Sequence, residues 1–444
     1  MSFKKNAFAT VALSAVAVAV SSAYAAGFQL SEHSATGMGR AMAGAGIVGD
    51  DLSALHFNAA GMTLLPGTRI QIGGAQIEVN AEFKGEGQYA GSENGRLKGQ
   101  LIPHGYISHQ VNDQTWVGLA MTVPYGMGTE YDQNWVGADK GTESMIMTLD
   151  INPQVAYKVN DFFSIGGGVS LQWAKAELGM LKYGMAQSWV KGDSWAWGWN
   201  IGLMFQPTDT LRLGVAYRSN ICHDAEGETK FEVNKDGYDL IQTPNAALEY
   251  VYANDPKALQ QALTLKAALQ GMAALGEADM NVRLRTPDTL TFSGTWEATQ
   301  DLRLSATARW TKWSNFGSLN VENTMMGQTS VSSTVNDWDD TWFFALGADY
   351  RVNNQWTVRG GVAYDMDPNS DNKKRMAVIP DTDRVWVSLG ASYKYDDNLT
   401  FDFGGTYIKG VGDKELWNEA RTAKYGEYDS LDSFIFAAAM QYRF

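Results

Sequence analysis

The residues of this chain that could do chemistry are few and widely spaced. Its five histidines are His33, His56, His104, His109 and His223. His104 and His109 are five residues apart, so on a regular strand their side chains point to opposite faces and cannot bind one metal ion. The single cysteine, Cys222, cannot complete a zinc site of the cysteine–histidine type. We therefore expect no metal centre built on these residues.

Hydroxyls and carboxylates give no stronger signal. A hydrolase needs a nucleophile, a base and an orienting group, and the sequence contains no Gly-x-Ser-x-Gly element. One group has the spacing of a calcium loop: Asp365, Asp367, Asn369 and Asp371. Ser370 stands where an EF-hand requires glycine, and Met376 where it requires a bidentate glutamate. We expect a solvated turn at residues 365–371, with loose binding of external calcium as the alternative. The sequence predicts no catalytic residue, no cofactor and no metal.

The chain begins with a leader. Two lysines precede an apolar run over 7–20, and the small-x-small sequence AYA follows it. This is the form of a signal peptide over 1–25. The run is too short for a spanning helix, which needs ~20 apolar residues. We expect the mature chain to start near Ala26 and to be exported.

Composition narrows the classes further. The net charge of -14, with no basic patch, argues against nucleic acid as a partner. One cysteine excludes an intrachain disulfide framework. The 15 tryptophans and 19 tyrosines suit a protein that meets membrane–water boundaries, where aromatic side chains collect.

Segments with strand character recur from residue 67 to the end of the chain. We predict fourteen: 68–84, 98–111, 115–131, 143–159, 162–177, 193–206, 211–233, 282–297, 302–321, 341–352, 355–366, 383–395, 399–410 and 431–444. Six connections are tight and rich in Asn and Asp, and they alternate with seven longer ones. This is the pattern of an antiparallel transmembrane β-barrel with short periplasmic turns and long external loops.

Polarity alternates along these segments with a period of two. In 434–444 alternate residues are all apolar, and in 302–310 apolar residues alternate with Arg, Ser and Thr. The run WAWGW places three indoles on one face: Trp195, Trp197 and Trp199. Apolar side chains are expected toward lipid and polar ones toward the interior.

Residues 26–66 do not resemble the wall. The segment is rich in Gly and Ala, has helix-like pieces at 39–45 and 52–57, and is too short to form its own core. We expect it to be a hatch, or plug, inside a barrel formed by 67–444. The longest external connection is expected to carry a helical insertion at about 245–280, with Asp255 as N-cap and Pro256 in its first turn.

The sequence resembles the FadL family of outer-membrane long-chain fatty acid transporters over nearly the whole mature chain. The resemblance is carried by AGFQLSEHSATGMGRAMAGAG, DDLSALHFNAAGM, VPYGMGTEY, INPQVAYKVNDFFSIGGGV, SWAWGWNIGL, LRTPDTLTFSGTWEATQDLRLSATARWTKWSNF and IPDTDRVWVSLGASY. It implies a fourteen-strand barrel in the bacterial outer membrane, closed by an N-terminal hatch, that takes up hydrophobic compounds from outside.

The resemblance also implies ligand-binding residues. They are Phe28 and Leu30 near the mature N-terminus, Lys175 on the fifth strand facing an inner pocket, and Asn320 at a second position that is basic in the family. The loop after the fifth strand is short here. The family's Asn-Pro-Ala element in the hatch reads Asn58-Ala59-Ala60 in this chain, so the proline that would restrict the backbone is missing.

The third predicted strand contains Pro124, Tyr125 and Gly126. Proline removes a ladder hydrogen bond, so a kink or bulge is expected. The family has a side opening at this strand, and the resemblance implies that cargo leaves there into the membrane. A kink that only accommodates the hatch is the alternative.

The combined interpretation is passive uptake of long-chain fatty acids or similar hydrophobic molecules by a monomer in contact with outer-membrane lipid and lipopolysaccharide. Uptake of monoaromatic hydrocarbons or alkanes is the nearest alternative. Two other classes fit less well. The hatch disfavours a general porin, and the missing catalytic residues disfavour a surface enzyme or adhesin.

Overall fold

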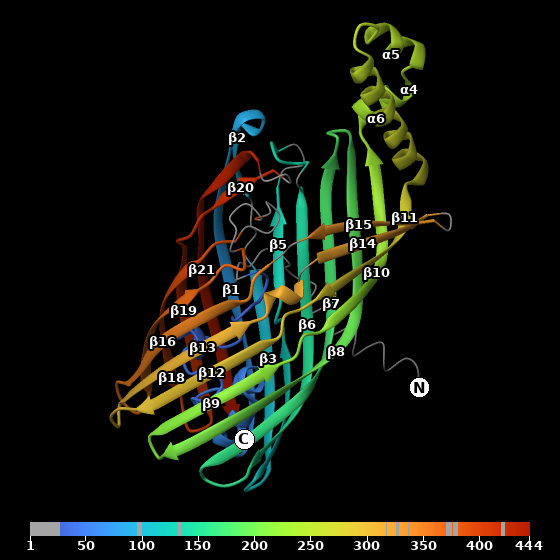
Figure 1. The fold of residues 1–444 in the computed structure, drawn as a ribbon. Coiled ribbons are helices and arrows are strands. Elements are labelled where there is room, and N and C mark those ends of the chain that lie inside the picture. The colour runs from blue at the N-terminus through green and yellow to red at the C-terminus, as the bar shows by residue number, and fades with distance from the viewer. Residues whose placement is uncertain are drawn as a thin grey trace.

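The computed structural model of this chain is a tall, closed barrel of antiparallel strands around a coiled segment (Figure 1). It describes residues 27–95, 100–131, 135–139, 141–316, 318–325, 328–335, 338–369, 375, 381–418 and 422–444; the predicted leader lies outside these ranges. The wall has 14 strands. It closes where β1 (Thr68–Gly85) pairs with β21 (Lys424–Arg443). The predicted fold class is confirmed.

Nine wall strands are continuous and five are broken in two. Besides β1 and β21, the continuous ones are β3 (Gln100–Asn112), β6 (Glu143–Lys158), β7 (Phe163–Lys182), β8 (Ala186–Thr208), β17 (Trp356–Asp365), β18 (Arg384–Lys394) and β19 (Leu399–Gly410). The broken ones are β4 (Thr115–Thr122) with β5 (Gly126–Glu130), β9 (Leu211–Arg218) with β10 (Cys222–Val233), β11 (Glu277–Arg285) with β12 (Thr289–Glu297), β13 (Leu302–Thr311) with β14 (Ser318–Met325), and β15 (Gln328–Val335) with β16 (Thr341–Arg351). Short β2 (Gly91–Gly95) and β20 (Glu415–Trp417) extend the rim.

Several predicted loops contain strands: besides β2 and β20 at the rim, β15 lies wholly within the predicted loop 322–340. Residues 178–192 were expected to connect two strands, whereas β7 runs to Lys182 and β8 begins at Ala186. Tyr183 and Gly184 have φ of 56° and 68°, which two consecutive left-handed residues of a tight hairpin require. Gly179, Gly184 and Gly192 gave this stretch a loop-like character, although the two strands continue the ladder across it.

The strands present apolar side chains outward, as expected from the period of two. Phe434 and Phe436 of β21 are 51% and 62% exposed, while Ser433 and Ile435 between them are buried. Trp195, Trp197 and Trp199 of β8 are likewise exposed on the outer surface. The wall therefore has an apolar, aromatic outside and a polar inside.

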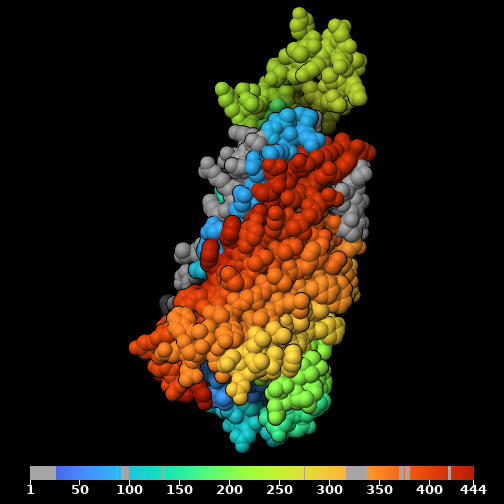
Figure 2. Space-filling model, turned by 90° about the vertical axis from the view of Figure 1, so that its left-hand side faces the viewer, coloured from blue at the N-terminus to red at the C-terminus, as the bar shows by residue number. Residues whose placement is uncertain are grey.

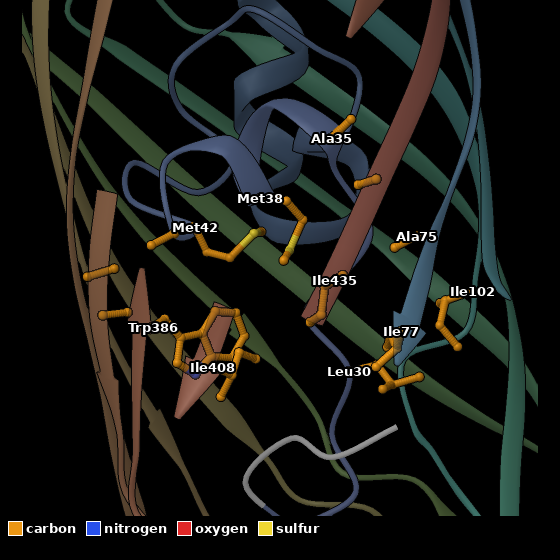
Figure 3. Packing of buried hydrophobic residues seen from close by; sticks show 14 of the residues in the cluster. Leu30, Ala35, Met38, Met42, Ala75, Ile77, Ile102, Trp386, Ile408 and Ile435 are labelled. Carbon is orange, nitrogen blue, oxygen red and sulfur yellow. The ribbon is translucent and has the colours of Figure 1, made fainter. Parts of the chain in front are cut away.

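The hatch lies inside the barrel and contains α2 (Ala35–Gly39), α3 (Ala54–Phe57) and the 3₁₀ helix η1 (Ala59–Leu64). Figure 3 shows Leu30, Met38 and Met42 of this segment enclosed by the wall strands. The wall permits close approach because it has glycines here: a Cβ on Gly361 would lie 2.3 Å from the backbone of Arg40. The hatch thus packs main chain against main chain.

One helix of the hatch lies elsewhere than expected. The sequence suggested a helical piece at 39–45, but α2 begins at Ala35 because Ser34 caps it and accepts a hydrogen bond from Gly37 N. The next turn cannot be helical, since Ala41 and Met42 have φ of 54° and 64°. The second predicted piece, 52–57, contains α3.

Three helices project beyond the rim of the barrel (Figures 1 and 2). They are α4 (Lys235–Gln242), α5 (Asn245–Val251) and α6 (Pro256–Leu275), so the insertion starts earlier than predicted. Asp255 is the N-cap of α6 as expected, and its side chain accepts from Ala258 N at 3.0 Å. No helix in the described part of the chain is both long and apolar enough to cross a membrane.

Candidate functional site

The wall is interrupted between β3 and β5. β4 pairs with β3 up to Met121 and with β6 up to Thr122, and β5 then continues alongside β6 from Gly126. Three residues, 123–125, lie opposite only two of β6, which is the count of a β-bulge. Within the described ranges no ladder joins β5 to β3. The interruption coincides with Pro124, where the sequence predicts a kink or bulge, and it leaves a gap in the hydrogen-bonded wall.

The first residues of the hatch lie against this interruption. Phe28 O accepts a hydrogen bond from Gly126 N, and Leu30 N donates to Pro124 O, both at 2.9 Å. Gln29 forms a bridge with Tyr125. The two edges of the gap also contain prolines, Pro103 on β3 and Pro124, which weaken strand pairing there. The N-terminal segment thus bonds to the backbone of residues 124–126 at the place where β3 does not pair with it.

Phe28 is completely buried in an aromatic cage. Its ring centroid lies 4.9 Å from those of Trp313 and Phe316, 5.8 Å from Tyr125 and 6.1 Å from Trp338, and the first three contacts are edge-on. Such contacts stabilise an aromatic ring beyond its area burial. The cage joins the hatch to the kinked strand and to the segment after β13, including the 3₁₀ helix η3 (Trp313–Phe316).

A small cavity adjoins this cage. Its volume is about 30 Å³, enough for water but not for an alkyl chain. It is lined from three sides, by the hatch, the kink and the wall: Gln29, His56, Asn58, Pro124, Tyr125, Arg218 and Arg309 among others. The resting structure therefore brings two guanidinium groups to the place where the hatch meets the gap.

The two arginines differ in how they are paired. Arg218 Nη1 lies 3.0 Å from Asp150 Oδ2, and its Nη2 donates to His56 O. Arg309 Nη1 donates to Ser31 Oγ at 2.9 Å, its Nε is buried without a hydrogen-bond partner, and the group lies over the Phe343 ring. No carboxylate of the described residues lies within 4 Å of it. Arg309 is the cation with capacity for an anionic ligand.

Further along the hatch, charged residues fix it to the wall. Arg40 pairs with Asp50 at 2.6 Å and with Asp349 of β16 at 3.0 Å, and Arg359 of β17 contacts the same two carboxylates at 3.4 and 2.7 Å. Burial alone would raise the pKa of Asp50, but Arg40 and Arg359 hold it below its usual value. The network stays ionised and anchors residues 40–50.

Asn58 takes a structural role at the start of η1. Its Oδ1 accepts from Ala60 N at 3.1 Å, and its Nδ2 donates to Leu203 O of the wall at 3.0 Å. Ala59 and Ala60 are buried against Gly166 and Gly202 of the wall. The cap and this packing hold the element in place without the proline expected from the family.

The predicted binding residues do not all converge. Phe28 and Leu30 are buried at the gap. The expectation that Lys175 faces an inner pocket is wrong: it shares a face with exposed Leu171, lies opposite exposed Asp193, and pairs with Glu177 at 2.7 Å. The backbone of Asn320 pairs with Arg283 in β14, but its side chain lies outside the described residues.

Because Lys175 is outside the barrel, the variant Lys175→Ala should bind an anionic ligand as tightly as the parent chain. The Lys175 side chain is 37% exposed in its ion pair with Glu177, and an ion pair that is screened by solvent contributes about 1 kcal/mol or less. Titration of both proteins with oleate, followed by tryptophan fluorescence, is the measurement. A tenfold loss of affinity in Lys175→Ala would contradict the outward placement.

A profile of the family described as outer membrane protein transport protein (OMPP1/FadL/TodX) matches residues 16–444. The chain belongs to this family. It is an outer-membrane β-barrel of the bacterial cell envelope.

Individual relatives span nearly the whole chain. The long-chain fatty acid transport protein of Escherichia coli O6:H1 is 27% identical over 472 residues, covering 100% of this chain and 99% of the relative. The 47 kDa outer membrane protein of Pasteurella multocida is 30% identical and covers 90% and 91%. A Pseudomonas aeruginosa FadL homologue superposes with a TM-score of 0.79 at 26% identity, over 94% and 100% of the two chains.

The Pseudomonas putida toluene transporter TodX has the same fold, with a TM-score of 0.68 at 15% identity over 95% and 100% of the chains.

Two residues at the gap, Arg218 and Arg309, have no role in the predictions made from the sequence. The alternation of 302–310 did place Arg309 on the interior face, which was the one available signal.

Proposed function

We propose that this protein takes up long-chain fatty acids, or closely similar amphiphilic molecules, by capturing them inside the barrel and releasing them sideways through the gap between β3 and β5. The observation that carries the proposal is the position of Arg309, a buried cation without a carboxylate partner among the described residues, beside the segment that covers the gap. The named activity of the E. coli relative supports it.

The apolar part of the ligand would take the place of Phe28. The cavity itself is too small for an acyl chain, so residues 27–30 must move when ligand enters. Their departure leaves an apolar, aromatic cavity formed by Trp313, Phe316 and Trp338. The carboxylate would bind Arg309. It would also bind Arg218, whose contact with Asp150 would then have to rearrange.

The same movement would open the exit. Phe28 and Leu30 give up their hydrogen bonds to Gly126 and Pro124 when the segment leaves, and β3 and β5 then have no cover from inside. The rest of the hatch can stay in place because Arg40 and its partners are fixed to the wall. Only the first residues need to move.

Other functions fit the site less well. A general porin needs an open lumen, whereas the described hatch residues fill it with buried side chains. Uptake of monoaromatic hydrocarbons, as named for the TodX fold relative, would not use a buried guanidinium. We also propose that residues 1–25 are cleaved, that the protein acts as a monomer without enzymatic activity, and that its outer surface contacts lipopolysaccharide.

The variant Arg309→Gln tests the headgroup assignment. A charged hydrogen bond contributes about 1.5–3 kcal/mol, so oleate affinity should fall roughly 10- to 150-fold. Affinity for oleyl alcohol, which has the same chain and no charge, should stay the same. Binding is measured by isothermal titration on the purified protein.

The matched control is Arg303→Gln. Arg303 lies on the same strand and face but pairs with Glu297 at 2.7 Å, away from the cavity. Oleate affinity of this variant should be unchanged. Equal losses of affinity for oleate and oleyl alcohol in Arg309→Gln would contradict the proposal that Arg309 binds the ligand's carboxylate.

A further inference from the structure

Two hatch histidines are in contact at the edge of the gap, beside Thr122 at the end of β4. The rings of His33 and His56 have centroids 4.3 Å apart and meet edge-to-face. His33 is completely buried, and neither of its ring nitrogens has a hydrogen-bond partner in the described protein. His56 is half-buried, lies 3.3 Å from Thr122 Oγ1 through its Nδ1, and lines the cavity that contains Arg309.

A third histidine lies on the wall nearby. His104 of β3 is buried, and both of its ring nitrogens also lack partners in the described part of the chain. It is next to Gly105, which forms the last β3 pair with β4 before the gap. Buried polar atoms are nearly always paired, so unpaired nitrogens call for an explanation.

Several charged and titratable groups surround this pair. They are Glu32, Asp51, His104, Tyr106, Tyr125, Asp150, Arg218 and Arg309. Burial lowers the pKa of His33 and His56 well below the usual value, and the neighbouring histidines and arginines lower it further. Both rings are therefore neutral while the site holds no anion.

Glu32 shows what this environment does to a carboxyl group. It precedes His33, is completely buried, and accepts a hydrogen bond from Ser31 N at 2.7 Å. Burial raises its pKa to about 7, against smaller opposing effects of backbone hydrogen bonds and arginines. A cargo carboxyl entering beside it meets the same loss of water.

We propose that His33 and His56 form a proton-transfer site that converts a bound carboxylate into its neutral acid before it passes between β3 and β5. The inference rests on the proposed function. The arriving carboxylate stabilises an imidazolium at His56, which takes its proton from a hydronium ion and leaves a water molecule. The N–H bond then breaks as an O–H bond forms on the carboxylate, giving RCOOH and neutral imidazole, and the next proton again comes from hydronium.

The need for such a step follows from the exit route. A carboxylate with an ordinary pKa near 4.3 is neutral in only about 1 of 500 molecules at pH 7. An ion leaving directly into hydrocarbon meets a large desolvation penalty, whereas the neutral acid does not. With a proton source beside the gap, release no longer depends on the small fraction of fatty acid that is neutral in solution.

The test compares initial uptake of radiolabelled oleate and oleyl alcohol at pH 5.5–8 by cells that lack their own fatty acid transporter and express the full chain. In His33→Gln/His56→Gln, oleate uptake should fall about tenfold for each pH unit, as the fraction of neutral acid in solution does. The parent chain should show a shallower decline. Oleyl alcohol uptake should be the same for both proteins at every pH.

His109→Gln is the matched control, since His109 is exposed on the outside of β3 and bonds to Thr68; it should behave like the parent chain. If the double variant does not reach the outer membrane, His56→Gln takes its place with the same criterion. An unchanged oleate pH dependence, or equal losses for the two cargoes, overturns the proton-transfer site while leaving the transport function intact. Parent cells that take up neither compound above background overturn both.

Discussion

A chain lacking Pro124 and carrying Pro103→Val should still bind oleate but take it up no faster than cells without the protein. The deletion leaves two residues opposite two of β6, so the ladder from Thr122 can continue into β5 in one register. Tyr125 and Met127 keep their inward direction because the alternation is preserved. The Pro103 change restores the donor that proline lacks on the facing edge.

Uptake and binding must be measured separately for this variant. Tryptophan fluorescence of the purified protein gives oleate affinity, radiolabelled oleate gives uptake, and heat-dependent mobility in gels confirms a folded barrel. A matched single change, Pro153→Val in the continuous ladder between β4 and β6, should leave uptake as it is. Parental uptake by the closed variant would rule out lateral exit.

The features of the fold that sequence predicted correctly are local ones. Alternating polarity in 434–444 is set by each residue's own neighbours, and it gives the observed outward Phe434 and Phe436. Asn- and Asp-rich turns follow from their own backbone preferences, and Pro124 marks the bulge by the bond it cannot make. These signals need no knowledge of distant contacts.

The site was harder to predict because it is assembled over long sequence distances. Phe28 meets Trp313 and Trp338, which are about three hundred residues away, and Arg309 meets Ser31. No local pattern identifies such partners. Interior arginines were visible in the alternation, but which of them lies at the gap depends on how the hatch enters the barrel.

Lys175 shows that a resemblance can assign a side chain to the wrong face of a strand. Shifting a strand by one position moves every side chain to the other face. The sequence VSLQWAK itself contained the answer, since Val169, Leu171 and Trp173 are apolar and share the parity of Lys175. The alternation placed Lys175 outside, and the structure agrees with the alternation.

Replacing Arg40 by methionine should release the hatch and turn the barrel into an open channel. Asp50 and Asp349 would then share only Arg359. Removing one partner from a buried ion pair costs about 3–5 kcal/mol, because the remaining charge is left without compensation. We expect steady ion conductance in planar bilayers for this variant and none for the parent protein, and sensitivity of cells to antibiotics that the outer membrane normally excludes.

An exposed ion pair in a turn of the wall provides the control for Arg40→Met. Lys394 and Asp397 pair at 2.6 Å in a turn, with side chains 47% and 93% exposed, and such pairs contribute about 0–1 kcal/mol. Lys394→Met should therefore be as silent as the parent chain. If Arg40→Met is equally silent and keeps the parent's melting temperature, the backbone contacts with Gly347 and Gly361 hold the hatch, and the charged network does not. Conductance confined to Arg40→Met would instead show that residues 40–50 form the fixed part of the hatch, against which residues 27–30 move.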